Sequence, residues 1–336
     1  MRLAGLGLAT AALLASATAN ATDLRLSTWV PPQHPLQTTG LEPWIKSMNE
    51  ASGGKINVTI FPAQQLGSAI DHYDMAANGI ADITYVNPGY QPGRFPVIAL
   101  GEQPFMATNA VGGTKAFDKW YRAYAEKEMS DVHVCMAFLH DTGTIHSTKP
   151  VQVPADMKGM NVRPGNATMG RFVSLLGGSS VQVSAPEARE VLARGAADAI
   201  TFPWGSIYLF GINEVTKHHI DMPLYTTTFV MAVNKAAYEG MPDDERKVFD
   251  DHCTSEWAQK VAEGWANWEA AGRDKAKSES DQIVYEPTES DMALWHEAAA
   301  PLMDDWRKEV TDAGYDPDAV YNALVGNLKA EGAYAE

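Results

Sequence analysis

The sequence predicts an α/β protein of two lobes, each a sheet flanked by helices, with one long helix spanning both lobes. Strand-like and helix-like segments alternate in the first third of the chain, with short joints marked by Gly and Pro, which is typical of a mostly parallel sheet covered by helices. The same alternation starts again near residue 132 without any residue-level repeat. A long helical segment begins at residue 243.

The N-terminal segment has the order of a secretory signal peptide at residues 1–21. Arg2 is followed by an apolar run from residue 3 to 17 and by a small-x-small site that ends at Ala21. The run is shorter than the roughly 18 residues that cross a bilayer as a helix, and no later run is apolar for that long. The mature chain of about 315 residues is therefore expected to be soluble, with no membrane span.

The composition argues against nucleic acid and anionic lipid as partners. Lys and Arg number 26 against 42 Asp and Glu, which gives a formal net charge of −16. An acidic surface of this size repels phosphate backbones and acidic headgroups. It does not exclude a local cationic pocket for a small anion.

The segments assigned to the first lobe alternate between the two-residue apolar period of a strand and the 3.6-residue period of a helix. We expect strands at 24–30, 55–61 and 83–86 and helices at about 41–50 and 71–78. In the second unit we expect strands at 132–138, 161–163, 180–183 and 199–202 and helices at 167–176 and 186–193. The predicted boundaries are 22–142 with about 229–260 for lobe I, 143–228 with about 261–300 for lobe II, and 301–336 for C-terminal helices that pack on the lobes.

A continuous helix is expected from Asp243 to about Ser278. Its aromatic and apolar residues recur every four positions from Phe249 to Trp265, which is the period of a buried helix face, so core packing is the favoured role of the stripe. At 1.5 Å per residue such a helix would be about 50 Å long, enough to brace both lobes. Cys253 lies in this helix and Cys135 in a strand, and the sequence leaves open whether they form a disulfide or two buried thiols.

No motif for covalent, phosphoryl or metal chemistry stands out, so no cofactor or metal site is predicted. His140, Asp141 and His146 lie close together and could form an acid/base pair or a metal site. Adjacent residues on an extended strand point to opposite faces, however, which favours a hydrogen-bonded interlobe loop over an enzyme site.

Arg163 is the strongest candidate for binding a ligand. It ends a strand-like run and is followed by Pro164-Gly165-Asn166 and a helix. Ligands of two-lobed α/β proteins bind at the carboxyl ends of strands, and a planar guanidinium can clamp a carboxylate with two hydrogen bonds. The alternative is an ordinary surface arginine.

Several segments together resemble the DctP family of TRAP transporter solute-binding proteins. The segments are 61–67 (FPAQQLG), 79–83 (GIADI), 149–163, 175–178 (LLGG), 195–198 (GAAD) and 233–235 with Met241-Pro242. The resemblance covers nearly the whole mature chain. It implies a monomeric periplasmic receptor, not an enzyme, whose lobes are joined by crossing strands, close on an organic acid and deliver it to the membrane permease.

Matching to the family also implies site residues. Arg163 falls on the family's carboxylate-binding arginine, and Trp29, Asn87 and Phe202 fall on cleft-lining positions. The sialic-acid branch has a second arginine where this chain has Gly143-Thr144, and an asparagine where it has Phe202. The remaining residues that we expect in the site are Tyr90, Trp204, Phe229, Thr144 and His146.

An aromatic wall around one anion clamp favours a compact carboxylate with an apolar or aromatic body, such as a benzoate or a 2-oxo acid. A sugar acid, a dicarboxylate and an ectoine-like zwitterion remain alternatives, as does a ligand-sensing subunit with the same fold. The hinges are expected near 142–144 and 226–228.

Overall fold

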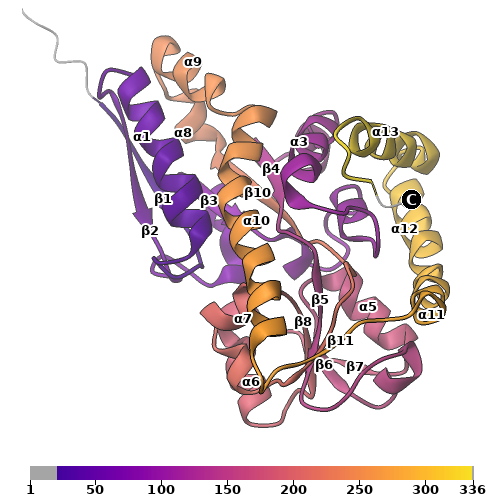
Figure 1. The fold of residues 1–336 in the computed structure, drawn as a ribbon. Coiled ribbons are helices and arrows are strands. Elements are labelled where there is room, and N and C mark those ends of the chain that lie inside the picture. Colours follow the sequence, from indigo (N-terminus) through magenta and orange to yellow (C-terminus); the bar gives the residue numbers. More distant parts are fainter. Residues whose placement is uncertain (1–20, 335–336) are drawn as a thin grey trace, which may run out of the picture.

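The computed structural model describes residues 21–334 and divides them between two α/β lobes, which lie one above the other in Figure 1. The upper lobe holds a five-stranded sheet and the lower lobe a six-stranded sheet. This confirms the predicted fold class. Residues 1–20 of the expected signal peptide lie outside the described residues.

The upper sheet combines strands from three parts of the chain. Its order is β2 (Ile56–Phe61), β1 (Thr22–Ser27), β3 (Ile83–Val86), β10 (Thr228–Asn234) and β4 (Val132–Leu139). The first three strands are parallel, and β10 runs antiparallel to both of its neighbours. β10 was not predicted, because its uninterrupted apolar run shows neither the alternation of a half-buried strand nor the 3.6-residue period of a helix.

The lower sheet has the order β11 (Ile283–Tyr285), β9 (His218–Ile220), β5 (Gly143–Ser147), β8 (Ala199–Pro203), β6 (Asn161–Arg163) and β7 (Ser179–Ser180). β6 is parallel to β7 and β8, whereas β5 is antiparallel to β8 and β9. The chain crosses between lobes at 140–142 and 221–227, and a bridge between Gly143 and Tyr225 pairs the two crossings.

Short helices follow the strands of both lobes. They are α1 (Glu42–Ala51), α2 (His72–Ala77), α3 (Ala110–Tyr121), α4 (Ala125–Glu128), α5 (Ala167–Leu175), α6 (Ala188–Ala193), α7 (Ser206–Leu209) and α8 (Lys235–Glu239). A π-helical turn, η1 (Leu36–Leu41), precedes α1. Asn166 caps α5 by accepting a hydrogen bond from the Met169 amide, which explains why this helix begins at Ala167, four residues after Arg163.

The predicted continuous helix from residue 243 to 278 is wrong. The structure has α9 (Asp243–Asp251) and α10 (Ser255–Ser278), separated by a break. Thr254 is extended, and its hydroxyl accepts a hydrogen bond from the Trp257 amide as the N-cap of α10. The 24 residues of α10 span about 36 Å, still enough to reach both lobes.

Figure 1 shows α10 running down the molecule from the upper lobe to the lower one. It packs on η1, α3 and β4 of the upper lobe and on α7 and β11 of the lower lobe. The C-terminal helices α11 (Glu289–Ala299), α12 (Pro301–Asp312) and α13 (Pro317–Ala330) form a column beside both lobes. Trp306 of α12 joins the core beside α3, and Trp295 of α11 joins the core of the lower lobe.

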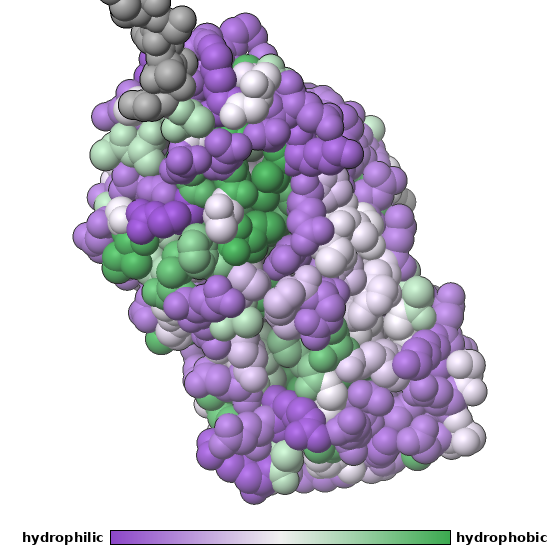
Figure 2. Space-filling view, turned by 90° about the vertical axis from the view of Figure 1, so that its left-hand side faces the viewer, coloured by the Kyte–Doolittle hydropathy of each residue, from purple (hydrophilic) through white to green (hydrophobic). Residues whose placement is uncertain are grey.

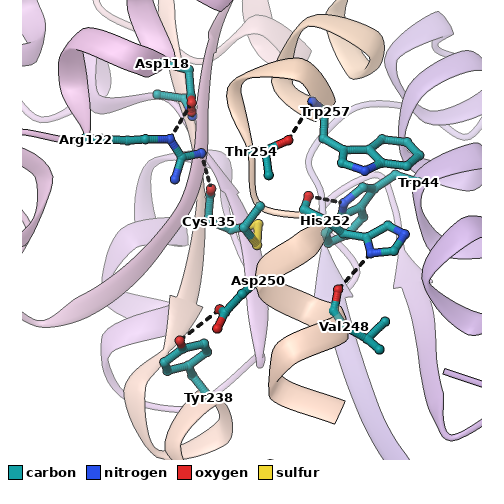
Figure 3. Close-up of a disulfide and its surroundings, with 12 residues drawn as sticks. Trp44, Asp118, Arg122, Cys135, Tyr238, Val248, Asp250, His252, Thr254 and Trp257 are labelled. Carbon is teal, nitrogen blue, oxygen red and sulfur yellow. Dashed lines mark hydrogen bonds and ion pairs between the residues drawn. A yellow bond between two sulfur atoms is a disulfide. The ribbon is translucent and has the colours of Figure 1, made fainter. Parts of the chain in front are cut away.

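Cys135 and Cys253 form a disulfide, which resolves the alternative left open by the sequence. The bond ties β4 to the break between α9 and α10, as Figure 3 shows. Neighbouring hydrogen bonds hold both sides of it: Arg122 donates to the Cys135 carbonyl, and the Trp44 indole donates to the His252 carbonyl. The break in the helix is therefore anchored to the upper sheet.

Figure 2 shows the face of the molecule that lies to the left in Figure 1. Hydrophilic residues cover most of both lobes on this face, and the largest group of apolar residues lies in the upper half. Among residues 21–334, no helix is long and apolar enough to cross a membrane.

Candidate functional site

A cavity lies between the lobes, at the ends of the strands that the sequence singled out. Its lining comes from both lobes and from α10: Trp29, His34, Asn87, Tyr90, His140, Arg163, Gly165, Ala185, Phe202, Pro203, Ser206, Phe210, Tyr225, Thr227, Phe229 and Trp265. Six of the nine residues that we expected in the site therefore meet in one place.

Arg163 stands at the carboxyl end of β6 with only 1% of its surface exposed. Its Nε donates to the Val183 carbonyl at 3.0 Å, and its Nη2 donates to the Tyr90 hydroxyl at 3.2 Å. Nη1 is buried without a partner among the described residues. Within residues 21–334, no carboxylate lies within 4.0 Å of this guanidinium. The cavity thus contains a buried cation with a free donor.

Other polar groups beside Arg163 also have unused donors. The Tyr90 oxygen accepts hydrogen bonds from Arg163 and from the Ala185 amide at 2.9 Å, which leaves its own proton free to donate. The hydroxyl of Tyr225 is buried without a partner among the described residues, and desolvation raises its pKa well above the usual value. These hydroxyls and Arg163 form a donor-rich end of the cavity.

Aromatic rings make up much of the remaining wall. Trp29 stacks on Tyr85 with ring centroids 5.0 Å apart and is fixed by an indole hydrogen bond to the Tyr85 carbonyl at 3.1 Å. Phe229 lies 5.5 Å from Trp265 of α10, and the guanidinium of Arg163 lies 5.5 Å from the Phe202 ring centre. The rings are held in place by one another, so the wall is preformed.

Thr144, His146 and Trp204 do not line this cavity, contrary to our expectation. Thr144 and His146 lie on β5 with side chains turned toward β9: Thr144 donates to the Ile220 carbonyl, and the Nδ1 atoms of His146 and His219 lie 2.7 Å apart. β8 ends at Pro203, and the next residue, Trp204, packs its ring edge-on against His146. The three side chains form part of the interior of the lower lobe instead.

The His146 and His219 imidazoles are both held in the neutral form. One Nδ1 must donate its proton to the other, so at least one of the two rings is neutral. Burial lowers the pKa of His146 well below its usual value and that of His219 to about 4.

His140 and Asp141 are engaged in structural hydrogen bonds. The Nε2 of His140 accepts from the Thr227 amide at 3.1 Å, and its Nδ1 contacts the Asp141 carbonyl. Asp141 turns away and accepts from the Ala110 amide at 3.1 Å. Burial lowers the pKa of His140 to about 4. Neither residue is arranged as a free acid or base, and among residues 21–334 no group of three or more His, Cys, Asp or Glu could hold a metal ion.

A network of polar contacts ties the lobes together near the crossings. Glu102 of the upper lobe accepts hydrogen bonds from Thr168 of α5 at 3.2 Å and from Thr228 at 3.1 Å. Asn166 donates to the Thr227 hydroxyl at 3.1 Å. Glu102 is fully enclosed, and burial raises its pKa to about 7.

Sequence reasoning missed several residues of the site. Trp265 belonged to a stripe that we assigned to core packing, and it serves both the core and the cavity wall. His34 follows Pro31-Pro32 in a loop without periodicity, and Tyr225 lies in the second crossing. The available signal was that His34 and Tyr225 lie close along the chain to Trp29 and Phe229, which were expected in the site.

A family model described as bacterial extracellular solute-binding protein, family 7 (DctP), matches residues 26–309. The chain belongs to the DctP family of TRAP solute-binding proteins. Members of this family are extracytoplasmic receptors that bind solutes.

Solved structures of this family resemble the chain over nearly its full length. A TRAP solute-binding protein from Rhodoferax ferrireducens, in complex with copurified benzoate, is 28% identical with a TM-score of 0.87, covering 92% of this chain and 98% of its own. A marine metagenome protein specific for aromatic acid ligands, in complex with 3-hydroxybenzoate, is 27% identical with a TM-score of 0.86, covering 93% and 99%. The transporter protein TsaT of Comamonas testosteroni, named as an outer membrane protein, is 21% identical over 91% of this chain and 93% of its own length.

Proposed function

We propose that this protein is the periplasmic receptor of a TRAP transporter, and that it binds a small aromatic carboxylate between its lobes and delivers it to the membrane permease. The observation that carries the proposal is the buried guanidinium of Arg163, which has no carboxylate partner among the described residues. Burying a charge without a counter-ion costs several kcal/mol. A bound carboxylate would supply the missing charge.

The donor-rich end of the cavity suits a carboxylate. Nη1 of Arg163 and the hydroxyl proton of Tyr90 are both free, and they come from opposite lobes. A carboxylate that accepted from both would hold the lobes together, because each of its oxygens can bond to a different lobe. Ligand binding and lobe closure would then be one event, with hinges at the crossings near 142–144 and 226–228.

The aromatic wall suits a ligand with a planar apolar body. Trp29, Phe202, Phe229 and Trp265 offer ring faces and edges, whereas a sugar acid would need many hydroxyl partners that this wall does not offer. The two relatives that bind benzoate and 3-hydroxybenzoate support the same reading. We propose that the receptor works as a monomer, as the resemblance to the DctP family implies.

The proposal is tested by isothermal titration of the purified mature protein with benzoate, mandelate, a 2-oxo acid, succinate, glucuronate and ectoine. We expect saturable binding of benzoate and at least tenfold weaker binding of the last three compounds. Thermal unfolding with each ligand provides an independent readout, because a ligand at one hundred times its Kd adds about 2.7 kcal/mol of stability. Binding of glucuronate or succinate in preference to every aromatic acid would refute the ligand class while leaving the family unaffected.

A further inference from the structure

His34 lies in the wall of the cavity with one side of its imidazole already committed. It is 2% exposed, and its Nδ1 accepts a hydrogen bond from the Leu36 amide at 3.1 Å. Nδ1 is therefore unprotonated, and the ring proton resides on Nε2. Nε2 makes no hydrogen bond to any of the described residues, although His34 lines the cavity.

His34 is connected to Arg163 along the cavity wall by a chain of ring contacts. Its ring centroid lies 6.4 Å from that of Phe210, which in turn lies 5.5 Å from that of Phe202, the ring beneath the Arg163 guanidinium. Phe210 and Phe202 thus lead along the wall from His34 to Arg163. A ligand whose carboxylate bonds to Arg163 and whose body lies along these rings would point its far edge toward His34.

The polar groups around Trp265, whose ring centroid lies 5.2 Å from that of His34, have their donors engaged. Trp265 donates its indole N–H to Glu269 at 2.7 Å, and the Ser206 hydroxyl donates to the same carboxylate. Both ring nitrogens of His140 are in use. The Nε2–H of His34 is thus a donor of the cavity wall with no partner among the described residues, and it is available to an oxygen of a bound ligand.

Resting on the proposed function, we propose that His34 is a specificity-determining residue that selects aromatic carboxylates carrying a neutral oxygen substituent on the ring edge away from the carboxylate, with Nε2–H as the donor to that oxygen. Burial lowers the pKa of His34 to about 3, so the ring stays neutral at ordinary pH. A neutral imidazole satisfies a phenolic or ether oxygen, but it cannot compensate the charge of a second carboxylate. The selected class is therefore hydroxylated or alkoxylated benzoates rather than aromatic dicarboxylates.

The test compares near-isosteric ligand pairs by isothermal titration: 3-hydroxybenzoate with 3-methylbenzoate, and 4-hydroxybenzoate with 4-methylbenzoate, with benzoate and isophthalate as references. We expect the full mature protein to prefer the hydroxylated member of at least one pair by about tenfold, which is the net contribution of about one hydrogen bond. Isophthalate should bind more weakly than benzoate.

Two variants assign the preference to the donor. His34→Phe keeps a ring but removes the N–H, so the preference should fall below about threefold. His34→Gln keeps an N–H near the position of Nε2 and should retain a measurable part of the preference. Phe210→Leu is a matched control that removes a neighbouring ring and should weaken both members of a pair alike, leaving their ratio unchanged.

Thermal unfolding of each variant shows whether it is folded, and His34→Gln keeps the test decisive if His34→Phe is not. An unchanged preference in His34→Phe, or no preference in the parent protein despite tight binding of benzoate, would overturn the role of His34 alone. Failure of every aromatic acid to bind the parent protein would instead overturn the proposed function.

Discussion

Replacing Arg163 with Met should abolish most ligand binding without destabilising the ligand-free protein. Met has a similar length and no charge, so the Arg163→Met variant removes the buried cation while keeping most of the packing. The Nε and Nη2 atoms of Arg163 contact only the Val183 carbonyl and the Tyr90 hydroxyl, and Tyr90 keeps its second hydrogen bond to the Ala185 amide. Few native contacts are therefore lost.

The magnitude follows from the free donor. A hydrogen bond between a charged donor and a carboxylate contributes about 1.5–3 kcal/mol, so the affinity for benzoate should fall by about 10- to 150-fold. In the absence of ligand, the variant loses two hydrogen bonds of the native state but also loses a buried charge that lacks a counter-ion. These effects oppose each other, so the free energy of unfolding should change by less than about 2 kcal/mol.

Isothermal titration measures the affinity for benzoate, and urea unfolding without ligand measures the free energy of unfolding. An Arg163→Lys variant serves as the control: it keeps the positive charge but not the planar fork, so its affinity should lie between those of the parent protein and the Met variant. A change in affinity of less than threefold would remove Arg163 from the site. A loss of ligand-free stability above about 3 kcal/mol would show that the residue is structural.

Three further predictions concern stability. The disulfide between Cys135 and Cys253 spans 118 residues, so replacing both cysteines with Ala should reduce the free energy of unfolding by about 2–5 kcal/mol. The thermal midpoint should fall by about 3–8 °C. A reductant should lower the midpoint of the parent protein but not that of the double variant. The pKa of Glu102, about 7, lies above its unfolded value, so the folded state binds more protons and its stability falls as pH rises from about 4.5 through 7. Glu102→Gln should thus raise the unfolding free energy relative to the parent protein more at pH 8 than at pH 5; an equal effect at both pH values would contradict the argument. The pKa of His219, about 4, lies below its unfolded value of about 6.5, so stability is lost as pH falls across that range, and urea unfolding of His219→Gln should show a smaller loss between pH 7 and pH 5.

The sequence by itself determined the fold class and the position of Arg163, the proposed anion clamp. Alternation of apolar residues is local information, so β1, β2, β3 and β4 could be placed to within a few residues. Arg163 could be assigned because it ends a strand directly before a capped helix, and the carboxyl ends of strands in such folds converge on one cleft. The resemblance to the DctP family placed Trp29, Asn87 and Phe202 beside the cleft, where the structure has them.

Only the tertiary structure decided which side chains face the cavity. Thr144 and His146 could turn toward the cleft or toward β9, and that choice depends on a strand partner more than 70 residues away. The disulfide depends in the same way on contacts between β4 and the break before α10. His34 acquires its free donor because Leu36, two residues on, occupies the other ring nitrogen, a backbone geometry that no residue pattern encodes. Local periodicity specifies the elements, but the orientation of a polar side chain is set by the partners that packing brings to it.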